Sequence, residues 1–202
     1  WFCLPALSQS TNGAEVQPGR FDQGKMWTFE NPPVAYFKEA YQFDLTQEWM
    51  DDVRQSALRF ASWCSASFIS ENGLILTNHH CSRSVTASVM KEGEDFDNQG
   101  FYATTLEEER RVPDLFVDQL VKVTDITREV TEKAKTMDAA EALKAVQKTY
   151  EAKEEWQGLV TETRTFYSGG RYSLYGFKRY RDVRLVLYPE LAMGFFGGDP
   201  DN

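Results

Sequence analysis

His79 and His80 are the only two histidines in the chain; they are adjacent and directly precede Cys81, and a second cysteine, Cys64, lies 17 residues before Cys81. Imidazole is the usual general base near neutral pH, and together with thiolates it also binds zinc. Two adjacent histidines rarely bind one metal, and the sequence has no C-x-x-C or H-x-x-x-H spacing, which argues against zinc. A general base, a zinc site and a structural histidine pair are the three alternatives.

The two histidines follow a predicted β-hairpin. Its strands cover residues 65–70 and 74–78, and the turn between them contains Asn72-Gly73, a dipeptide that supplies the positive φ angles of tight hairpins. The histidines are then expected to end the second strand. Because neighbours on an extended segment face opposite sides, His79 is expected to point away from any site that His80 serves.

Other elements of the chain are predicted from periodicity and capping. An apolar stripe with helical spacing predicts a helix over residues 45–60, and a capping box at Asp138 predicts another that runs to about Trp156. Extended segments are predicted at 115–123, at 166–177 around a Gly-Gly turn, and at 183–188. This mixture predicts a mainly β fold with helices, of the α+β class.

The composition excludes several classes of protein. Of the 202 residues, 42% are hydrophobic and 14% aromatic, as expected for a soluble chain with a packed core. The formal net charge of −9 argues against binding to nucleic acid. No apolar run approaches the ~20 residues of a membrane-spanning helix, so no membrane span is predicted.

The surroundings of His80 resemble those of the catalytic histidine in chymotrypsin-like serine peptidases. In that family the histidine ends a strand just before a cysteine, and this cysteine is bridged to the start of the preceding strand. One imidazole nitrogen must face a serine and the other an acid, and a local disulfide helps to fix the turn. The resemblance implies that His80 is the general base and that Cys64 and Cys81 form a disulfide.

Several longer segments resemble the bacterial dipeptidyl-peptidase family of serine exopeptidases, which includes dipeptidyl-peptidases 7 and 11. The most specific motifs are T-N-H-H-C at 77–81 and F-G-G-D-P-D-N at 196–202. Other matching segments follow in the family's order, at 24–27, 64–70, 100–102, 168–172 and 182–186. The resemblance implies that the chain is the truncated N-terminal part of a chymotrypsin-like double β-barrel peptidase.

This resemblance implies an activity and its residues. The enzyme would release dipeptides from short peptides with a free N-terminus, without a metal or an organic cofactor. His80 would be the catalytic base, and Asn202 would bind the α-ammonium group of the substrate. The family's triad aspartate and serine come after Asn202, so these 202 residues alone would be inactive. The alternative is a non-catalytic secreted protein that keeps the same barrel and binds peptides or has a structural role.

The first residues have the character of a processed leader. An apolar run and a small-x-small site at residues 6–8 predict that residues 1–10 are the remnant of a signal peptide. A short apolar arm docked on the domain is the alternative. Residues 11–25 are expected to form a linker, and 26–202 to belong to the peptidase domain. A periplasmic or secreted protein is therefore expected, and the family is compatible with a homodimer.

Overall fold

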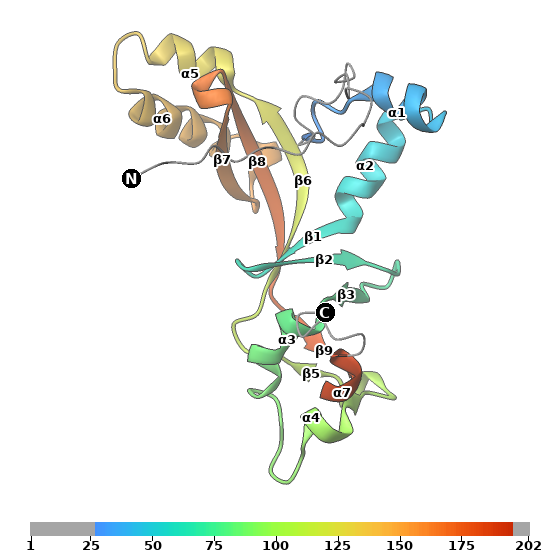
Figure 1. Ribbon diagram of the computed structural model, residues 1–202. Helices are drawn as coiled ribbons and strands as arrows, with labels where there is room; N and C mark the ends of the chain where they lie inside the picture. Colours follow the sequence, from blue (N-terminus) through green and yellow to red (C-terminus); the bar gives the residue numbers. More distant parts are fainter. Residues whose placement is uncertain (1–26, 196–202) are drawn as a thin grey trace, which may run out of the picture. The chain divides into compact units, whose positions relative to one another are not determined.

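The computed structural model describes residues 27–195 (Figure 1). The chain divides into two compact units, one up to Thr46 and one from Gln47 onward. The predicted signal-peptide remnant at 1–10, the linker at 11–25 and the predicted substrate-binding residue Asn202 lie outside the described residues.

The first unit contains a single described helix, α1 (Val34–Tyr41), which sequence analysis did not predict. It follows two prolines, a residue type that is tolerated where a helix begins. It ends at Gln42, whose φ of 53° lies in the left-handed region. The ring of Tyr36 packs against that of Trp27 with centroids 5.5 Å apart, so aromatic contacts stabilise this short segment.

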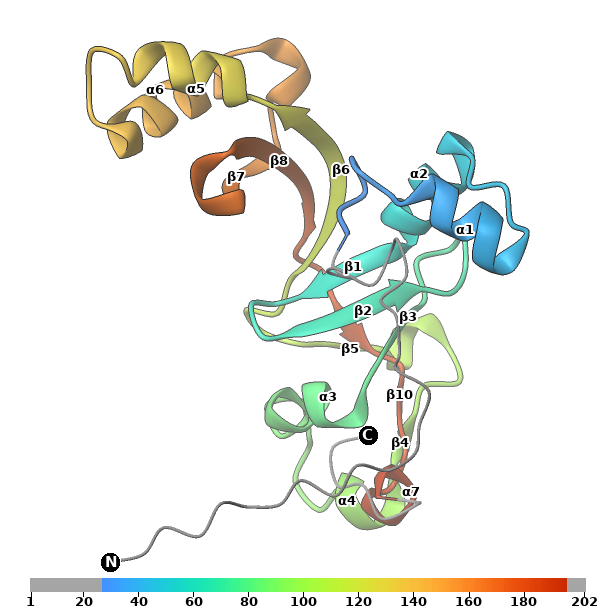
Figure 2. The same cartoon turned by 45° about the horizontal axis from the view of Figure 1, so that its top comes forward.

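The second unit is built on a six-stranded antiparallel sheet in the order β3-β2-β1-β6-β8-β7 (Figure 2). Its strands are β1 (Ala57–Phe60), β2 (Cys64–Phe68), β3 (Ile75–Thr77), β6 (Val117–Asp125), β7 (Val160–Phe166) and β8 (Arg171–Tyr180). Strands β3 and β7 form the two edges, so the described residues close no barrel by strand pairing. The double β-barrel stays a prediction.

Helices cover one end of this sheet. Between β6 and β7 the chain forms α5 (Thr127–Lys133) and α6 (Ala139–Glu151), followed by a 3₁₀ turn at Glu154–Trp156. The Asp138 carboxylate accepts hydrogen bonds from the first turn of α6, as the capping pattern predicts. The buried side chains of this end form one cluster, consisting of Ile126, Val130, Ala142, Val146, Trp156 and Leu174.

At the other end of β6 and β8, short elements gather around a second cluster of buried side chains (Figure 1). Two sheets of two antiparallel strands lie here, one of β4 (Phe101–Tyr102) and β10 (Leu187–Tyr188), the other of β5 (Arg110–Arg111) and β9 (Arg184–Leu185). The helices here are α3 (His79–Thr86), α4 (Phe96–Gln99) and α7 (Leu191–Gly194), with a 3₁₀ turn at Leu106–Glu108.

Most predicted elements are present, but several predictions were wrong in part. The helix that begins after Asp138 ends at Glu151 and does not run to about Trp156, which lies in the separate 3₁₀ turn. The helix predicted over 45–60 is α2 (Gln47–Ser56) followed by β1, because Leu58 and Phe60 are buried alternately and pair with both β2 and β6. The strand predicted at 183–188 is divided between β9 and β10, which pair with different partners. The helical spacing of apolar residues extends beyond Ser56, but from Ala57 onward pairing with the neighbouring strands determines the conformation.

The predicted hairpin is formed by β2 and β3, with the turn where the sequence placed it. The Gly73 N–H donates to the Ser70 carbonyl at 3.3 Å, and Gly73 has a φ of 85°. Asn72 has no positive φ, so the glycine alone supplies the left-handed conformation.

Candidate functional site

The two histidines begin a helix instead of ending a strand. Strand β3 ends at Thr77, Asn78 is extended with φ −73° and ψ 149°, and α3 starts at His79. Asn78 stands at the N-cap, a position that favours asparagine, so the sequence did contain a signal for this helix start, although the Asn78 side chain makes no capping hydrogen bond here. Consecutive helix residues are about 100° apart around the axis, so the two imidazoles still face different directions, as expected.

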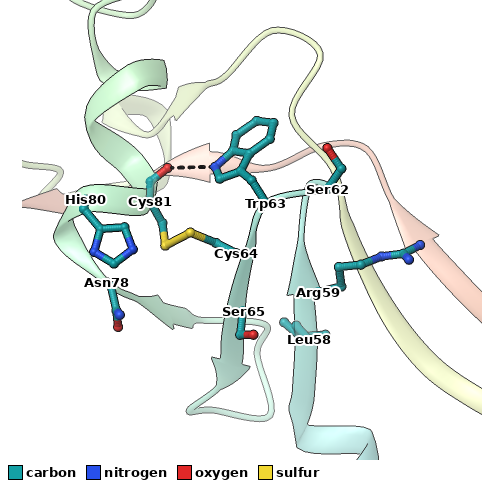
Figure 3. Close-up of a pocket in the computed structure, with 9 residues that line it drawn as sticks. All are labelled: Leu58, Arg59, Ser62, Trp63, Cys64, Ser65, Asn78, His80 and Cys81. Carbon is teal, nitrogen blue, oxygen red and sulfur yellow. Dashed lines mark hydrogen bonds between the residues drawn. A yellow bond between two sulfur atoms is a disulfide. The ribbon is translucent and has the colours of Figure 1, made fainter. Parts of the chain in front are cut away.

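His80 is exposed and lines an open hollow of about 580 Å³ (Figure 3). Its imidazole lies beside the disulfide, on the side of Asn78 (Figure 3). The other residues that line the hollow come from β1, β2, the turn between them and the start of α3: Leu58, Arg59, Ser62, Trp63, Cys64, Ser65, Asn78 and Cys81. An exposed imidazole at the rim of a hollow can exchange protons with a bound molecule.

A disulfide between Cys64 and Cys81 fixes the position of this helix start. It joins the first residue of β2 to the first turn of α3, with the two Cα atoms 6.0 Å apart. The Trp63 indole N–H donates to the Cys81 carbonyl at 3.5 Å, so the neighbouring chain contributes a second connection (Figure 3). His80 is thereby attached to the rigid part of the sheet.

The same residues were the candidate zinc site. Ligand atoms of Cys64, His80 and Cys81 lie within 4.8 Å of one another, and no other group of this kind occurs in the part of the chain that the structure describes. Both sulfur atoms are bonded to each other, so neither is available as a thiolate ligand. The geometry therefore favours a histidine beside a structural bridge over a metal centre.

His79 has a different environment from His80, since it is only 9% exposed. Burial is the main cause that lowers its pKa, and the nearby positive charge of Arg83 lowers the pKa further. The Pro189 carbonyl and the Asp97 carboxylate favour the protonated form, but their effect is smaller. Burial thus favours the neutral imidazole of His79, which is not among the residues that line the hollow beside His80.

A charged network lies under the hollow and was not predicted. Arg59, which lines the hollow, pairs with Asp118 and Glu162, each at 2.6 Å, and Asp118 also pairs with Arg179 at 2.7 Å. Asp118 is fully buried. Burial alone would raise its pKa, but the hydrogen bonds from Arg179 and Arg59 outweigh that effect and lower the pKa. The four residues come from four strands, so no local pattern in the sequence could indicate the network.

Comparison with known proteins identifies the family of this chain. The family model described as peptidase S46 matches residues 21–202. The chain belongs to the peptidase S46 family. The matched segment contains His80, both cysteines of the bridge and Asn202, so the whole candidate site lies within the family's region.

Curated S46 relatives are named dipeptidyl-peptidases. An Asp/Glu-specific dipeptidyl-peptidase of Capnocytophaga gingivalis is 35% identical over 162 residues, covering 74% of this chain and 22% of the relative. Dipeptidyl-peptidase 7 of Porphyromonas gingivalis is 32% identical over 169 residues, covering 80% of this chain and 23% of the relative. The chain thus spans less than a quarter of the length of these relatives.

A solved structure of the family has the same fold over most of the chain. The crystal structure of Porphyromonas endodontalis DPP11 in complex with the dipeptide Arg-Glu matches with a TM-score of 0.71 and 26% identity. The match covers 89% of this chain and 28% of the DPP11 chain. The mixed α and β arrangement described above is therefore that of one portion of an S46 peptidase.

Proposed function

We propose that this chain carries part of the catalytic machinery of a serine dipeptidyl-peptidase, with His80 as its general base. The observation that supports the proposal most directly is the exposed His80 imidazole beside the Cys64–Cys81 bridge, within the segment matched by the S46 family. The relatives include an Asp/Glu-specific dipeptidyl-peptidase and a dipeptidyl-peptidase 7. The proposal therefore covers the release of dipeptides and does not specify which side chain is preferred next to the cleaved bond.

In the proposed mechanism His80 accepts one proton and then donates it in each of the two half-reactions. It accepts the proton of a serine hydroxyl while the serine oxygen attacks the scissile carbonyl carbon, and it donates that proton to the leaving amine nitrogen. A water molecule then attacks the acyl-enzyme with the same imidazole as base, which releases the dipeptide and restores the serine. The serine and the acid of the triad are contributed by the protein beyond residue 202, and no metal or organic cofactor takes part.

Asn202 is proposed to restrict this activity to free N-termini. Its amide oxygen would accept a hydrogen bond from the substrate's α-ammonium group without adding a charge that must itself be desolvated. A hydrogen bond to a charged group contributes about 1.5–3 kcal/mol. The partners are accordingly short peptides with a free N-terminus.

The proposed location is the periplasm or the exterior of a bacterial cell. The Cys64–Cys81 disulfide fits an oxidising compartment. Among the described helices, none has both the length and the apolar character that a membrane crossing requires. A homodimer stays a prediction.

The test uses the full-length protein and fluorogenic dipeptide amides with an apolar or an acidic residue before the cleaved bond. Each substrate is prepared with a free and with an acetylated N-terminus. We expect release from the free-amine substrates alone, and a fall of about 10⁴-fold in kcat/KM for His80→Ala, because a triad base contributes several orders of magnitude. Ser84→Ala, an exposed change on the same helix, is the control and should stay within twofold.

Asn202→Ala should lower kcat/KM for free-amine substrates by about tenfold to a hundredfold, the equivalent of one charge-assisted hydrogen bond. Equal cleavage of acetylated substrates by the wild type would contradict the role of Asn202. Binding of peptides without any turnover, unchanged in His80→Ala, would support the alternative of a non-catalytic peptide-binding protein.

A further inference from the structure

The imidazole of His79 is enclosed by two elements from much later in the chain. It stacks on the ring of Tyr188 in β10, with centroids 4.5 Å apart and an interplanar angle of 29°. It also touches Gly194, the last residue of α7: a Cβ atom placed on this glycine would lie 2.8–2.9 Å from three atoms of the imidazole ring. Helix α7 therefore rests with its backbone directly on His79, and any side chain at position 194 would displace one of them.

A histidine is unusual at a buried position where its ring nitrogens have no hydrogen-bond partner. The Pro189 carbonyl and the Asp97 carboxylate lie near the His79 imidazole, but neither ring nitrogen makes a hydrogen bond of normal geometry within the described residues, although His79 is buried. Buried polar groups are almost always hydrogen-bonded, so an exception calls for an explanation. The stacking on Tyr188 and the absence of a Cβ at position 194 indicate that the flat shape of the ring is what the packing uses.

The position of His79 connects the helix that carries the proposed base to β10 and α7. His79 and His80 are the first two residues of α3, so a shift of one moves the other. Gly194 ends α7. The contact between His79 and Gly194 thus joins the helix that carries the proposed base to an element more than 100 residues later in the chain.

We propose that His79 is a positioning residue, which fixes the start of α3, and with it His80, against β10 and α7. This inference rests on the proposed function. A displacement of the base by about 1 Å is enough to reduce catalysis about a hundredfold.

The test is a double-mutant cycle in the full-length protein with a free-amine dipeptide amide as substrate. Gly194→Ala should lower kcat at least tenfold, with KM changed less than threefold, because the substrate still binds but the base is displaced. In the His79→Ala background, where no ring remains for the new Cβ to meet, the same change should cost less than twofold. His79→Ala alone should lower kcat more than threefold.

A control separates positioning from stability. Val146→Ala removes buried apolar packing at the other end of the sheet and should leave kcat within twofold of the wild type. All variants are assayed at a temperature at which circular dichroism shows them folded. If Gly194→Ala does not fold, the cycle is repeated with Tyr188→Leu. This variant removes the ring that stacks on His79.

The inference is overturned if His79→Ala and Gly194→Ala behave like Val146→Ala, or if their effects multiply in the double variant. These outcomes require a wild type that releases dipeptides and depends on His80. A wild type without dipeptide release, or one that is unaffected by His80→Ala, would instead overturn the proposed function.

Discussion

At one end of β6 and β8, the helices α5 and α6 pack against the sheet with regular hydrogen bonding, a capped helix and an apolar cluster. At the other end, α3, α4 and α7 surround strands of only two residues each. Both ends bury apolar side chains, but only the second contains histidines, the hollow and the disulfide.

The second end contains a covalent cross-link, which the first end lacks. Besides the disulfide, Arg110 forms an ion pair with Glu94 and lies over the ring of Phe101, 4.4 Å from its centroid. Hydrogen bonds from the Arg110 side chain and the Lys91 backbone lower the pKa of Glu94 to about 2. Short strands provide few backbone hydrogen bonds, so covalent, charged and aromatic contacts must fix the loops.

The two ends should therefore respond differently to substitutions. At the helical end, we expect the loss of an interaction to lower the stability of the protein without changing its activity. At the end with the histidines, the same contacts that stabilise the chain also place the proposed base. Changes there are expected to affect both stability and activity.

The largest effect on stability is expected where the two ends meet, at the buried Asp118. Asp118→Ala leaves Arg59 and Arg179 without their common partner and should lower the free energy of unfolding by about 3–5 kcal/mol, the usual cost of breaking a buried ion pair. Urea denaturation measures the change. The exposed Asp52→Ala is the control and should stay within about 0.5 kcal/mol.

The pH dependence of this variant sharpens the test. Because the pKa of Asp118 is lower in the folded protein than in the unfolded chain, its contribution to stability is present above the unfolded pKa of about 3.9. It is lost as the pH falls through the folded pKa. The wild type should therefore lose stability in acid more steeply than Asp118→Asn, and parallel curves would contradict the assignment.

The second effect concerns the bridge. Cys64→Ser combined with Cys81→Ser should lower the free energy of unfolding by about 3 kcal/mol, the value for a loop of this length on the chain-entropy model. Dipeptide release should fall as well, since the start of α3 loses its attachment to β2. Wild-type protein treated with a reductant is the matched control and should behave like the double variant. Two free thiols in the oxidised wild type, found by mass spectrometry, would refute the bridge.

The smallest effect is expected at the helical end. Asp138→Ala removes the N-cap of α6 and should cost about 1 kcal/mol in thermal or urea unfolding, with kcat/KM within twofold of the wild type. Asp138→Asn, which keeps a good capping group, should restore most of the loss. A tenfold fall in kcat/KM for Asp138→Ala would mean that this end takes part in the site, contrary to the comparison.

The sequence alone determined those features that neighbouring residues control. The hairpin of β2 and β3 depends on a turn in which Gly73 takes a positive φ, and the start of α6 depends on the Asp138 carboxylate. Alternation predicted β6, and two motifs, at 77–81 and 196–202, indicated the family that the comparison then identified. Each of these can be recognised from a short stretch of neighbouring residues.

Tertiary structure decided the rest, because the deciding contacts join distant residues. Ala57–Phe60 became a strand when β2 and β6 offered backbone partners, although its spacing continues a helical stripe. Asp118 is charged in the core only because arginines from two other strands meet it. The sequence could place His79 and His80 on different sides. Only the packing of Tyr188 and Gly194 on the first ring, and the hollow beside the second, gave the two imidazoles different environments.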